Sequence, residues 1–108
     1  MTVRELMDLI GARSLNDSAP LDAEITCGYT CDLLSWVLAH GKQGMAWCTV
    51  QTHVNVIAVA VLMEMACVIL VEGVEAEPAS LKKAQEEDMP VLATGKTAYE
   101  VSVLMGQA

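Results

Sequence analysis

Apolar positions along the chain fall into two patterns, short continuous runs and helical spacing. Three continuous runs predict strands buried on both faces: "MAWCTV" (45–50), "CVILV" (67–71) and "PVLA" (90–93). Helical patterns follow them over 53–65, with Thr52 as N-cap, over 78–88, with Pro78 in the first turn, and from Thr97, in capping-box spacing with Glu100. Strands that alternate with helices predict a parallel sheet with right-handed crossovers.

The first third of the chain is less regular. "TVRELMDLI" (2–10) places Thr2 and Glu5 in capping-box spacing and predicts a helix. "LDAEITCGY" (21–29) suggests an edge strand followed by a turn at Gly28, and "CDLLSWVLAH" (31–40) a helix with Asp32 near its positive end. We therefore predict a single α/β domain over residues 1–108, with a mostly parallel sheet, helices packed on it, and an N-terminal helix and edge strand.

The run from Val54 to Val71 raises the alternative of a membrane span, because only Asn55 and Glu64 in it are clearly polar. Glu64 in mid-span costs on the order of 3 kcal/mol, which offsets much of the roughly 3–6 kcal/mol gained from the aliphatic residues. The nearest basic residues are Lys42 and Lys82, so the flanks lack a positive-inside signal. A helix followed by a β-branched strand explains the run better than a membrane helix.

Composition and charge narrow the class of protein. The chain is 54% hydrophobic and 19% charged, which excludes a disordered chain, and its net charge of −8 argues against binding to nucleic acid or to an anionic membrane. The N-terminus lacks the uninterrupted apolar core of a signal peptide. We therefore expect a cytoplasmic protein whose four cysteines are reduced.

The helix predicted over 53–65 is apolar on nearly every face. A sheet covers only one side of such a helix, so we predict that a second copy of the chain covers the rest and that the protein is a homodimer. Trp36 and Trp47 have no basic neighbours, which favours core or dimer-interface packing over base stacking.

Polar residues follow each predicted central strand, where open parallel sheets bind their ligands. The predicted ligand-binding residues are Thr49, Gln51, Thr52, His53, Glu72, Gly73, Thr94 and Lys96. Free N–H groups at a helix N-terminus would favour a phosphate or a carboxylate there. A structural interpretation also stays open, in which Thr52 is only a cap, His53 a surface residue and Lys96 a solvated charge.

No catalytic, cofactor or metal site is complete. "TGKT" (94–97) lacks the leading glycine of a P-loop, no GxGxxG follows a strand, and neither His40 nor His53 has a nucleophile and an orienting acid in its sequence context. Cys27 and Cys31 could face the same way on one helical turn, but they form only one loose pair of metal ligands. We expect no enzyme activity, no cofactor and no metal site; a redox or metal role for these two cysteines is a weaker alternative.

Several pieces occur in an order and spacing that resemble the small DRTGG-domain proteins: "GYTCDLLS" (28–35), "QTHVNVIAVAVL" (51–62), "ILVEG" (69–73) and "PVLAT…TAYEV" (90–101). The resemblance covers nearly the whole chain. Such domains resemble the N-terminal domain of HPr kinase/phosphorylase, and occur as inserts in CBS-domain pyrophosphatases and in some phosphate acetyltransferases. The resemblance implies a dimerising α/β domain that is regulatory or ligand-sensing rather than catalytic, with a nucleotide or phosphorylated metabolite as ligand.

This chain departs from the broader family's residues at two places. "QTH" (51–53) stands where the family tends to have an Asp-Arg pair, and Val71-Glu72-Gly73 stands where it tends to have Thr-Gly-Gly. The missing arginine removes a bidentate phosphate partner, and Glu72 adds a negative charge. The sequence therefore favours a neutral or mixed-charge ligand, or no ligand, more than the broader family's residues do.

Two functions follow as hypotheses. The first is a non-catalytic regulatory or ligand-sensing homodimer with a nucleotide or phosphometabolite site at the carboxyl ends of the strands. The alternative is an adaptor subunit for a larger enzyme or kinase, without a small-molecule site.

Overall fold

The computed structural model describes residues 1–108. The helices are α1 (Val3–Leu9), α2 (Leu34–His40), α3 (Val54–Leu62), α4 (Pro78–Glu86) and α5 (Ala98–Gln107), and the strands are β1 (Arg13–Ser14), β2 (Cys27–Thr30), β3 (Met45–Thr49), β4 (Cys67–Leu70) and β5 (Val91–Ala93). The strands form one sheet in the order β1-β5-β4-β3-β2, in which only the β1–β5 pair is antiparallel. The predicted α/β fold with a mostly parallel sheet is confirmed.

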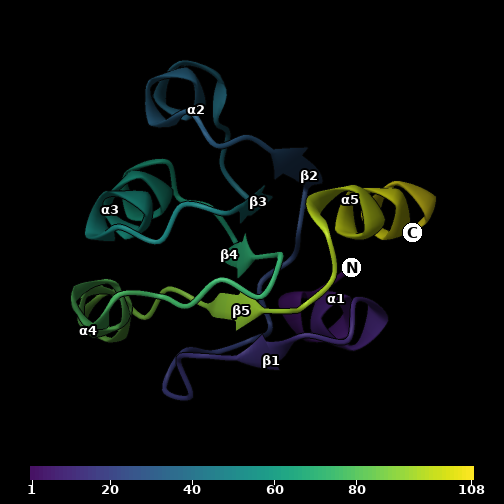
Figure 1. Ribbon diagram of the computed structural model, residues 1–108, viewed down its shortest axis with the longest axis horizontal. Coiled ribbons are helices and arrows are strands. Elements are labelled where there is room, and N and C mark those ends of the chain that lie inside the picture. The colour runs from purple at the N-terminus through teal and green to yellow at the C-terminus, as the bar shows by residue number, and fades with distance from the viewer.

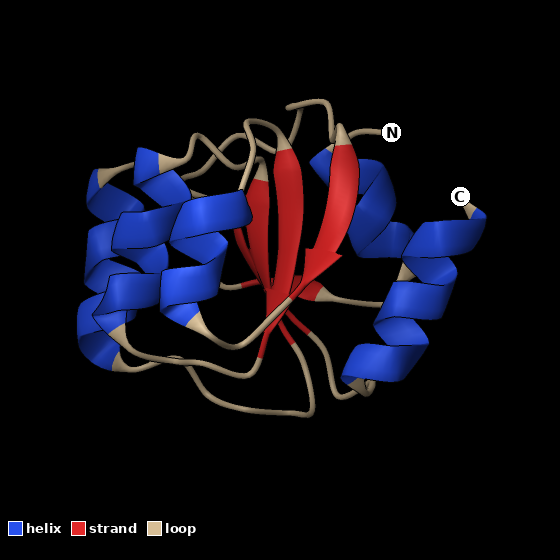
Figure 2. Cartoon of the chain, turned by 90° about the horizontal axis from the view of Figure 1, so that it is seen from above, coloured by secondary structure: helices blue, strands red, loops and turns tan.

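Helices cover both faces of the sheet, so the molecule has three layers (Figures 1 and 2). α2, α3 and α4 lie over the face that presents Trp47, Val68 and Leu70. α1 and α5 lie over the other face, which presents Cys48 and Ile69. Every residue of β3 and β4 is buried, because strands at the centre of such a sheet have a helix layer on each side.

The long apolar run divides into a helix and a strand, as the residue types predict. α3 ends at Leu62, Glu64 takes a left-handed backbone conformation with φ 54°, and β4 begins at Cys67. No helix in the structure has both the length and the apolar character needed to cross a membrane.

α3 lies between α2 and α4 in its layer and packs against both (Figure 1). These two helices cover the flanks that the sequence argument assigned to a second copy of the chain. The premise of that argument is therefore wrong, because it treated the sheet as the only cover for α3. Leu62, at the end of α3, is the one large apolar side chain of this helix that stays mostly exposed, at 70%.

The predicted N-cap of α3 is wrong by one residue. His53 is the cap, and its Nδ1 accepts a hydrogen bond from the Asn55 N–H at 3.1 Å. The carbonyl of Thr52 is instead held by α4, because the Ser80 hydroxyl donates to it at 2.6 Å. The loop after β3 is thus fixed by contacts to the neighbouring helix.

The first third of the chain contains the other corrections. Gly28 lies inside β2 rather than in a turn after it, and a Cβ there would stand 3.1 Å from the Met105 side chain of α5. Glycine therefore allows a close approach between α5 and the sheet. β1 was not predicted, because two residues are too short to show a period.

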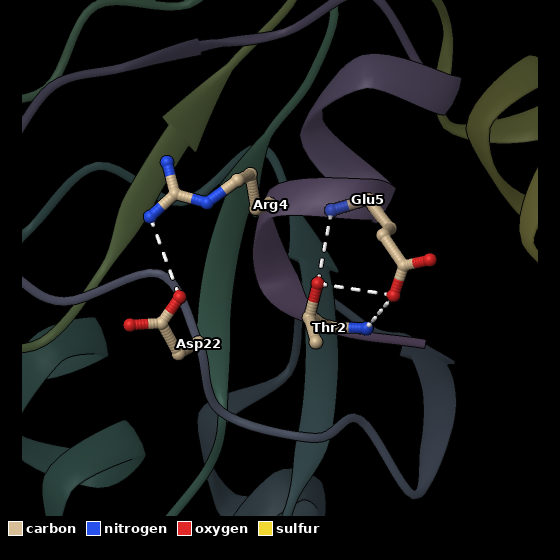
Figure 3. A network of polar contacts seen from close by, with 4 residues as sticks. All are labelled: Thr2, Arg4, Glu5 and Asp22. Carbon is tan, nitrogen blue, oxygen red and sulfur yellow. Dashed lines mark hydrogen bonds and ion pairs between the residues drawn. The ribbon is translucent and has the colours of Figure 1, made fainter.

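The predicted capping boxes at both terminal helices are confirmed. Thr2 and Glu5 exchange side-chain and backbone hydrogen bonds at the start of α1, where Arg4 also lies 3.4 Å from Asp22 (Figure 3). Thr97 and Glu100 do the same at the start of α5. The pKa of each glutamate is lowered below its ordinary value of 4.5. The main cause is the hydrogen bond from the threonine backbone N–H, and the second is the hydrogen bond to the threonine side chain.

Asn16 ties the segment after β1 to the rest of the fold. Its buried Nδ2 group donates to the carbonyls of Ala84 and Met89 at 2.9 and 3.0 Å, and its Oδ1 accepts from Ser18 at 2.8 Å. One side-chain amide thereby donates hydrogen bonds to a carbonyl near the end of α4 and to another just before β5.

We predict that Asn16→Ala lowers the free energy of unfolding by about 2–3 kcal/mol, because the Met89 carbonyl loses its donor and the Ala84 carbonyl keeps only the Met89 N–H. Urea denaturation measures the loss. Asp17→Ala, at the exposed neighbouring position, is the matched control and should change stability by less than about 0.5 kcal/mol. Equal effects of the two substitutions would contradict the anchoring role of Asn16.

We also predict that the capping boxes make stability fall in acid. Because the pKa of Glu5 and of Glu100 is lowered in the folded state, their contribution is complete above the ordinary value of 4.5 and is lost as the pH falls below it. Glu100→Gln should therefore show a smaller loss of unfolding midpoint between about pH 5 and pH 3 than the unaltered chain. Identical pH profiles in urea denaturation would contradict this assignment.

Candidate functional site

The carboxyl ends of β3, β4 and β5 lie along one edge of the sheet, since the three strands are parallel. Of the eight predicted ligand-binding residues, Thr49 ends β3 and the other seven follow these strands. The structure divides them into a group after β3, which is used to build the fold, and a group after β4 and β5, part of which lines an open groove.

Thr49 and Gln51 are engaged by Asp32, which the sequence analysis placed at the positive end of α2. α2 has no side-chain cap, and the Asp32 carboxylate instead accepts from the Thr49 hydroxyl at 2.8 Å and from the Val50 N–H at 3.0 Å. The Gln51 side chain donates to the Asp32 carbonyl at 3.1 Å. These contacts hold the loops after β2 and β3 together. The Thr49 hydroxyl, the Val50 N–H and the Gln51 side-chain N–H are all engaged by Asp32.

Thr52 and His53 stand at the mouth of a cleft between α3 and α4. Apolar side chains, among them Val56, Ile57 and Leu81, fill most of this cleft. The remaining cavity of about 10 Å³ has room for one water molecule at most. The cleft is therefore a packing seam, and a metabolite would bind here only outside it.

Glu72 closes the N-terminus of α5. Its carboxylate accepts from the Ala98 N–H at 3.0 Å, and the capping box of Thr97 and Glu100 occupies further N–H groups. An anionic ligand is thereby excluded from this helix end, where the dipole would otherwise favour it. Glu72 and Lys96 form no ion pair, although the Glu72 N–H donates to the Lys96 carbonyl at 2.8 Å.

An open groove of about 310 Å³ lies where three loops meet beyond β4 and β5. We call it the glycine groove. The loops are those after α1, after β4 and after β5, and their lining residues are Gly11, Ala12, Arg13, Gly73, Val74, Glu75, Ala93, Thr94 and Gly95. Of the predicted residues, Gly73 and Thr94 line it. Lys96 is not a lining residue, but its Nζ lies beside one of them, Gly11.

The groove exposes backbone and positive charge together. A Cβ at Gly73 or Gly95 would meet no atom within 4 Å, so both backbones are open to a ligand. A Cβ at Gly11 would stand 3.2 Å from the Nζ of Lys96, which places this ammonium against the wall of the groove. Neither Arg13 nor Lys96 has a carboxylate within 4.0 Å.

Two further groups complete the chemistry of the groove. The Gly95 N–H has no hydrogen-bond acceptor within the chain, while the adjacent Lys96 N–H donates to the Thr94 hydroxyl at 3.2 Å. Glu75 is exposed and adds one carboxylate. The groove therefore offers cationic donors, a backbone N–H and a single anionic acceptor.

Sequence reasoning missed Gly11, Arg13 and Glu75 as lining residues. Arg13 reaches the groove only because β1 pairs antiparallel with β5, with Arg13 opposite Ala93. That pairing joins segments some eighty residues apart and leaves no local signal. The only available signal was Gly11 itself, which follows a predicted helix and has φ 63°.

The cysteines do not form a pair. Cys27 begins β2 and Cys31 follows its end, so they are separated along a strand by roughly 13 Å rather than sharing a helical turn. No group of three or more histidine, cysteine or acidic side chains is arranged to hold a metal ion. Burial raises the pKa of the Cys48 thiol to about 11 and of the Cys67 thiol to about 12, which disfavours both as nucleophiles at neutral pH.

Comparison with known proteins identifies the fold. No protein-family model and no curated protein matches the chain. A solved structure, the CBS and DRTGG domains of the regulatory region of Clostridium perfringens pyrophosphatase complexed with the activator diadenosine tetraphosphate, superimposes with a TM-score of 0.75. The chain has a CBS/DRTGG-like fold. The match covers 98% of this chain and 46% of that one, so this chain spans about half the length of the neighbour, at 12% sequence identity.

We predict that the exposed and the buried thiols react with a disulfide reagent at different rates. Cys27 is exposed and should react with a disulfide reagent at about pH 8 at the rate of a free thiol. Cys48 should react at least about 100-fold more slowly, because its pKa of about 11 against an ordinary 9.0 depletes the thiolate even before access is considered. Mass spectrometry after timed labelling, with the urea-unfolded chain as control, distinguishes the sites; equal rates would contradict the buried placement.

Proposed function

We propose that the chain is a non-catalytic regulatory or ligand-sensing domain that binds a nucleotide or a phosphorylated metabolite in the glycine groove. The observation that carries the proposal is the presence of two unpaired cations, Arg13 and Lys96, beside exposed glycine backbone. In a chain of net charge −8, cations left without carboxylate partners at one groove are suited to an anion from outside.

A phosphate group fits the donors of the groove. Arg13 supplies a planar fork of N–H groups, Lys96 a compact charge, and Gly95 a free backbone N–H. Bare backbone at Gly73 and Gly95 permits the close approach that side chains would prevent. This site replaces the helix N-terminus of α5 as the place for an anion, because Glu72 already occupies that terminus.

Glu75 favours a ligand that carries hydrogen-bond donors as well as phosphate. A carboxylate repels a bare anion but accepts from a ribose hydroxyl or a base amine. The volume of about 310 Å³ lies at the small end of the range for metabolite sites, which suits a mononucleotide. The mixed-charge ligand expected from the sequence therefore agrees with the lining of the groove.

The structural neighbour supports the class of function. It is a regulatory region in complex with a nucleotide activator. The resemblance of this sequence to DRTGG-domain proteins, and through them to the N-terminal domain of HPr kinase/phosphorylase, supports the same regulatory and non-enzymatic role. The position of the ligand rests on the groove alone.

An adaptor function without a small-molecule site is the second candidate. It is favoured by α2 and its N-cap residue Leu33, because the Leu33, Trp36 and Leu38 side chains are 61%, 53% and 45% exposed. Uncovered apolar side chains on one short helix are typical of a surface that contacts another protein, such as a larger enzyme or kinase.

We predict that ADP or AMP raises the melting temperature and binds in isothermal titration calorimetry, and that Arg13→Ala and Lys96→Ala each weaken binding about tenfold or more. Lys82→Ala, an exposed lysine on α4, is the matched charge control and should leave affinity unchanged. Inorganic phosphate alone should bind more weakly than either nucleotide, since it makes no contact to Glu75.

A further variant distinguishes the groove from the site predicted after β3. His53→Ala should leave nucleotide affinity unchanged if the ligand occupies the glycine groove, because His53 lies beside the α3–α4 cleft instead. Loss of binding in His53→Ala but not in Arg13→Ala would contradict the groove and support the loop after β3. Absence of binding by nucleotides and by a broader panel of phosphorylated metabolites would contradict ligand sensing and leave the adaptor function.

A further inference from the structure

A second hollow adjoins the glycine groove on the outer surface of α5. It has a volume of about 370 Å³ and is open to solvent. We call it the α5 hollow, and its lining residues are Lys96, Tyr99, Glu100, Val103 and Leu104. The two sites meet at Lys96, which lines the hollow while its Nζ lies beside Gly11 in the wall of the groove. One ligand can therefore contact both.

Tyr99 dominates the α5 hollow. At 79%, it is the most exposed of the large apolar side chains in the chain. The fold does not need this ring for packing, because α5 contacts the sheet through Val101 and Met105 instead. Val103, one turn further along the helix, is 37% exposed and extends the apolar surface. An aromatic face beside aliphatic side chains is a surface on which a flat ring stacks.

Charge changes sign from the groove to the hollow. Arg13 and Lys96, on the groove side, have no carboxylate within 4.0 Å, whereas Glu100 is the one acidic residue that lines the hollow. The Glu100 Oε1 atom accepts from the Thr97 N–H at 3.0 Å, and its Oε2 atom has no hydrogen-bond partner in the chain. A carboxylate oxygen repels a phosphate and accepts from an amine. The phosphate end of a ligand therefore belongs in the groove and an amine-bearing end in the hollow.

We infer that the α5 hollow receives the base of the nucleotide whose phosphate lies in the glycine groove, with the base stacked on the Tyr99 ring. This inference rests on the proposed function and refines it, because it requires the phosphate site at Arg13 and Lys96. A nucleotide has its groups in the matching order: an anionic phosphate, a ribose, and a flat base with apolar faces. Since the base lies beyond Lys96, the ribose hydroxyls remain as the donors to Glu75.

The lining of the hollow favours adenine over uracil. Adenine has the larger face for stacking on Tyr99, and its edge carries an amine that can donate to the free Oε2 of Glu100. Uracil has a carbonyl oxygen where cytosine has an amine, and this oxygen would face the carboxylate. The inferred ligand class is therefore an adenine nucleotide.

The test compares AMP, which carries the base, with ribose 5-phosphate, which lacks it, by isothermal titration calorimetry of the 108-residue chain. AMP should bind about tenfold more tightly than ribose 5-phosphate, with UMP between the two. Tyr99→Ala should weaken AMP about tenfold and leave ribose 5-phosphate unchanged, whereas Tyr99→Phe keeps the ring and should retain most of the affinity for AMP. Arg13→Ala should weaken both ligands alike.

Trp36→Ala is the matched control, because it removes another exposed aromatic ring, from α2 at the other end of the sheet. It should leave the affinity for both ligands unchanged. Tyr99→Ala should also unfold at the same urea midpoint as the unaltered chain, since the ring is exposed. A loss of AMP affinity in this variant then reports on the base and not on folding.

Nuclear magnetic resonance locates the base directly. The chain has two tyrosines, Tyr29 and Tyr99, so tyrosine-labelled protein gives two sets of ring signals, which Tyr99→Ala assigns. AMP should shift the Tyr99 ring signals and leave those of Tyr29 in place, because only the Tyr99 ring lies under the base. Ribose 5-phosphate should shift neither set.

The results separate this inference from the proposed function. If AMP and ribose 5-phosphate bind equally well, or if Tyr99→Ala binds AMP as the unaltered chain does, the base lies outside the α5 hollow and the inference is overturned, while the phosphate site stands. If neither ligand binds, or if Arg13→Ala binds both normally, the proposed site in the glycine groove fails and the inference fails with it.

Discussion

The burial of β3 and β4 on both faces is the constraint on which the rest of the structure depends. All five residues of β3 and all four of β4 are buried, so each face requires a layer of helix. α2, α3 and α4 supply one layer, and α1 and α5 supply the other. Because the strands are parallel, every crossover returns over a face, and all the loops after the strands collect at one edge.

Crowding at that edge explains why most of its polar residues serve the fold. A loop between two packed layers must satisfy its backbone, and Asp32, Thr49 and Ser80 do so for the loops after β2 and β3. Next to β1, the sheet ends in two residues and no helix follows on the outside, so space stays open there. The glycine groove lies there, and its open glycines and unpaired cations are not required by the packing.

The two ends of the sheet therefore have different properties. The β1 end is short and charged and adjoins the groove, whereas the β2 end is uncharged and flanked by an apolar helix. The proposed ligand site and the exposed apolar side chains of the adaptor alternative thus lie at opposite ends of the sheet, with β5, β4 and β3 between them.

Residues 45–108 carried enough local information to predict their elements. Continuous apolar runs, the capping boxes and Pro78 are signals within one turn or one strand, and the structure places β3, α3, β4, α4, β5 and α5 where they indicate. The α/β class and the mostly parallel sheet follow from that alternation alone.

Only the tertiary structure decided how the polar residues outside the two capping boxes are used. Asp32 binds the loop after β3 instead of capping α2, and Glu72 closes α5 instead of lining a pocket. Arg13 reaches the groove through a two-residue antiparallel strand that no local pattern marks. The reason is physical: apolar residues must be buried wherever they occur, whereas a polar side chain takes whichever partner the folded chain brings within hydrogen-bond distance.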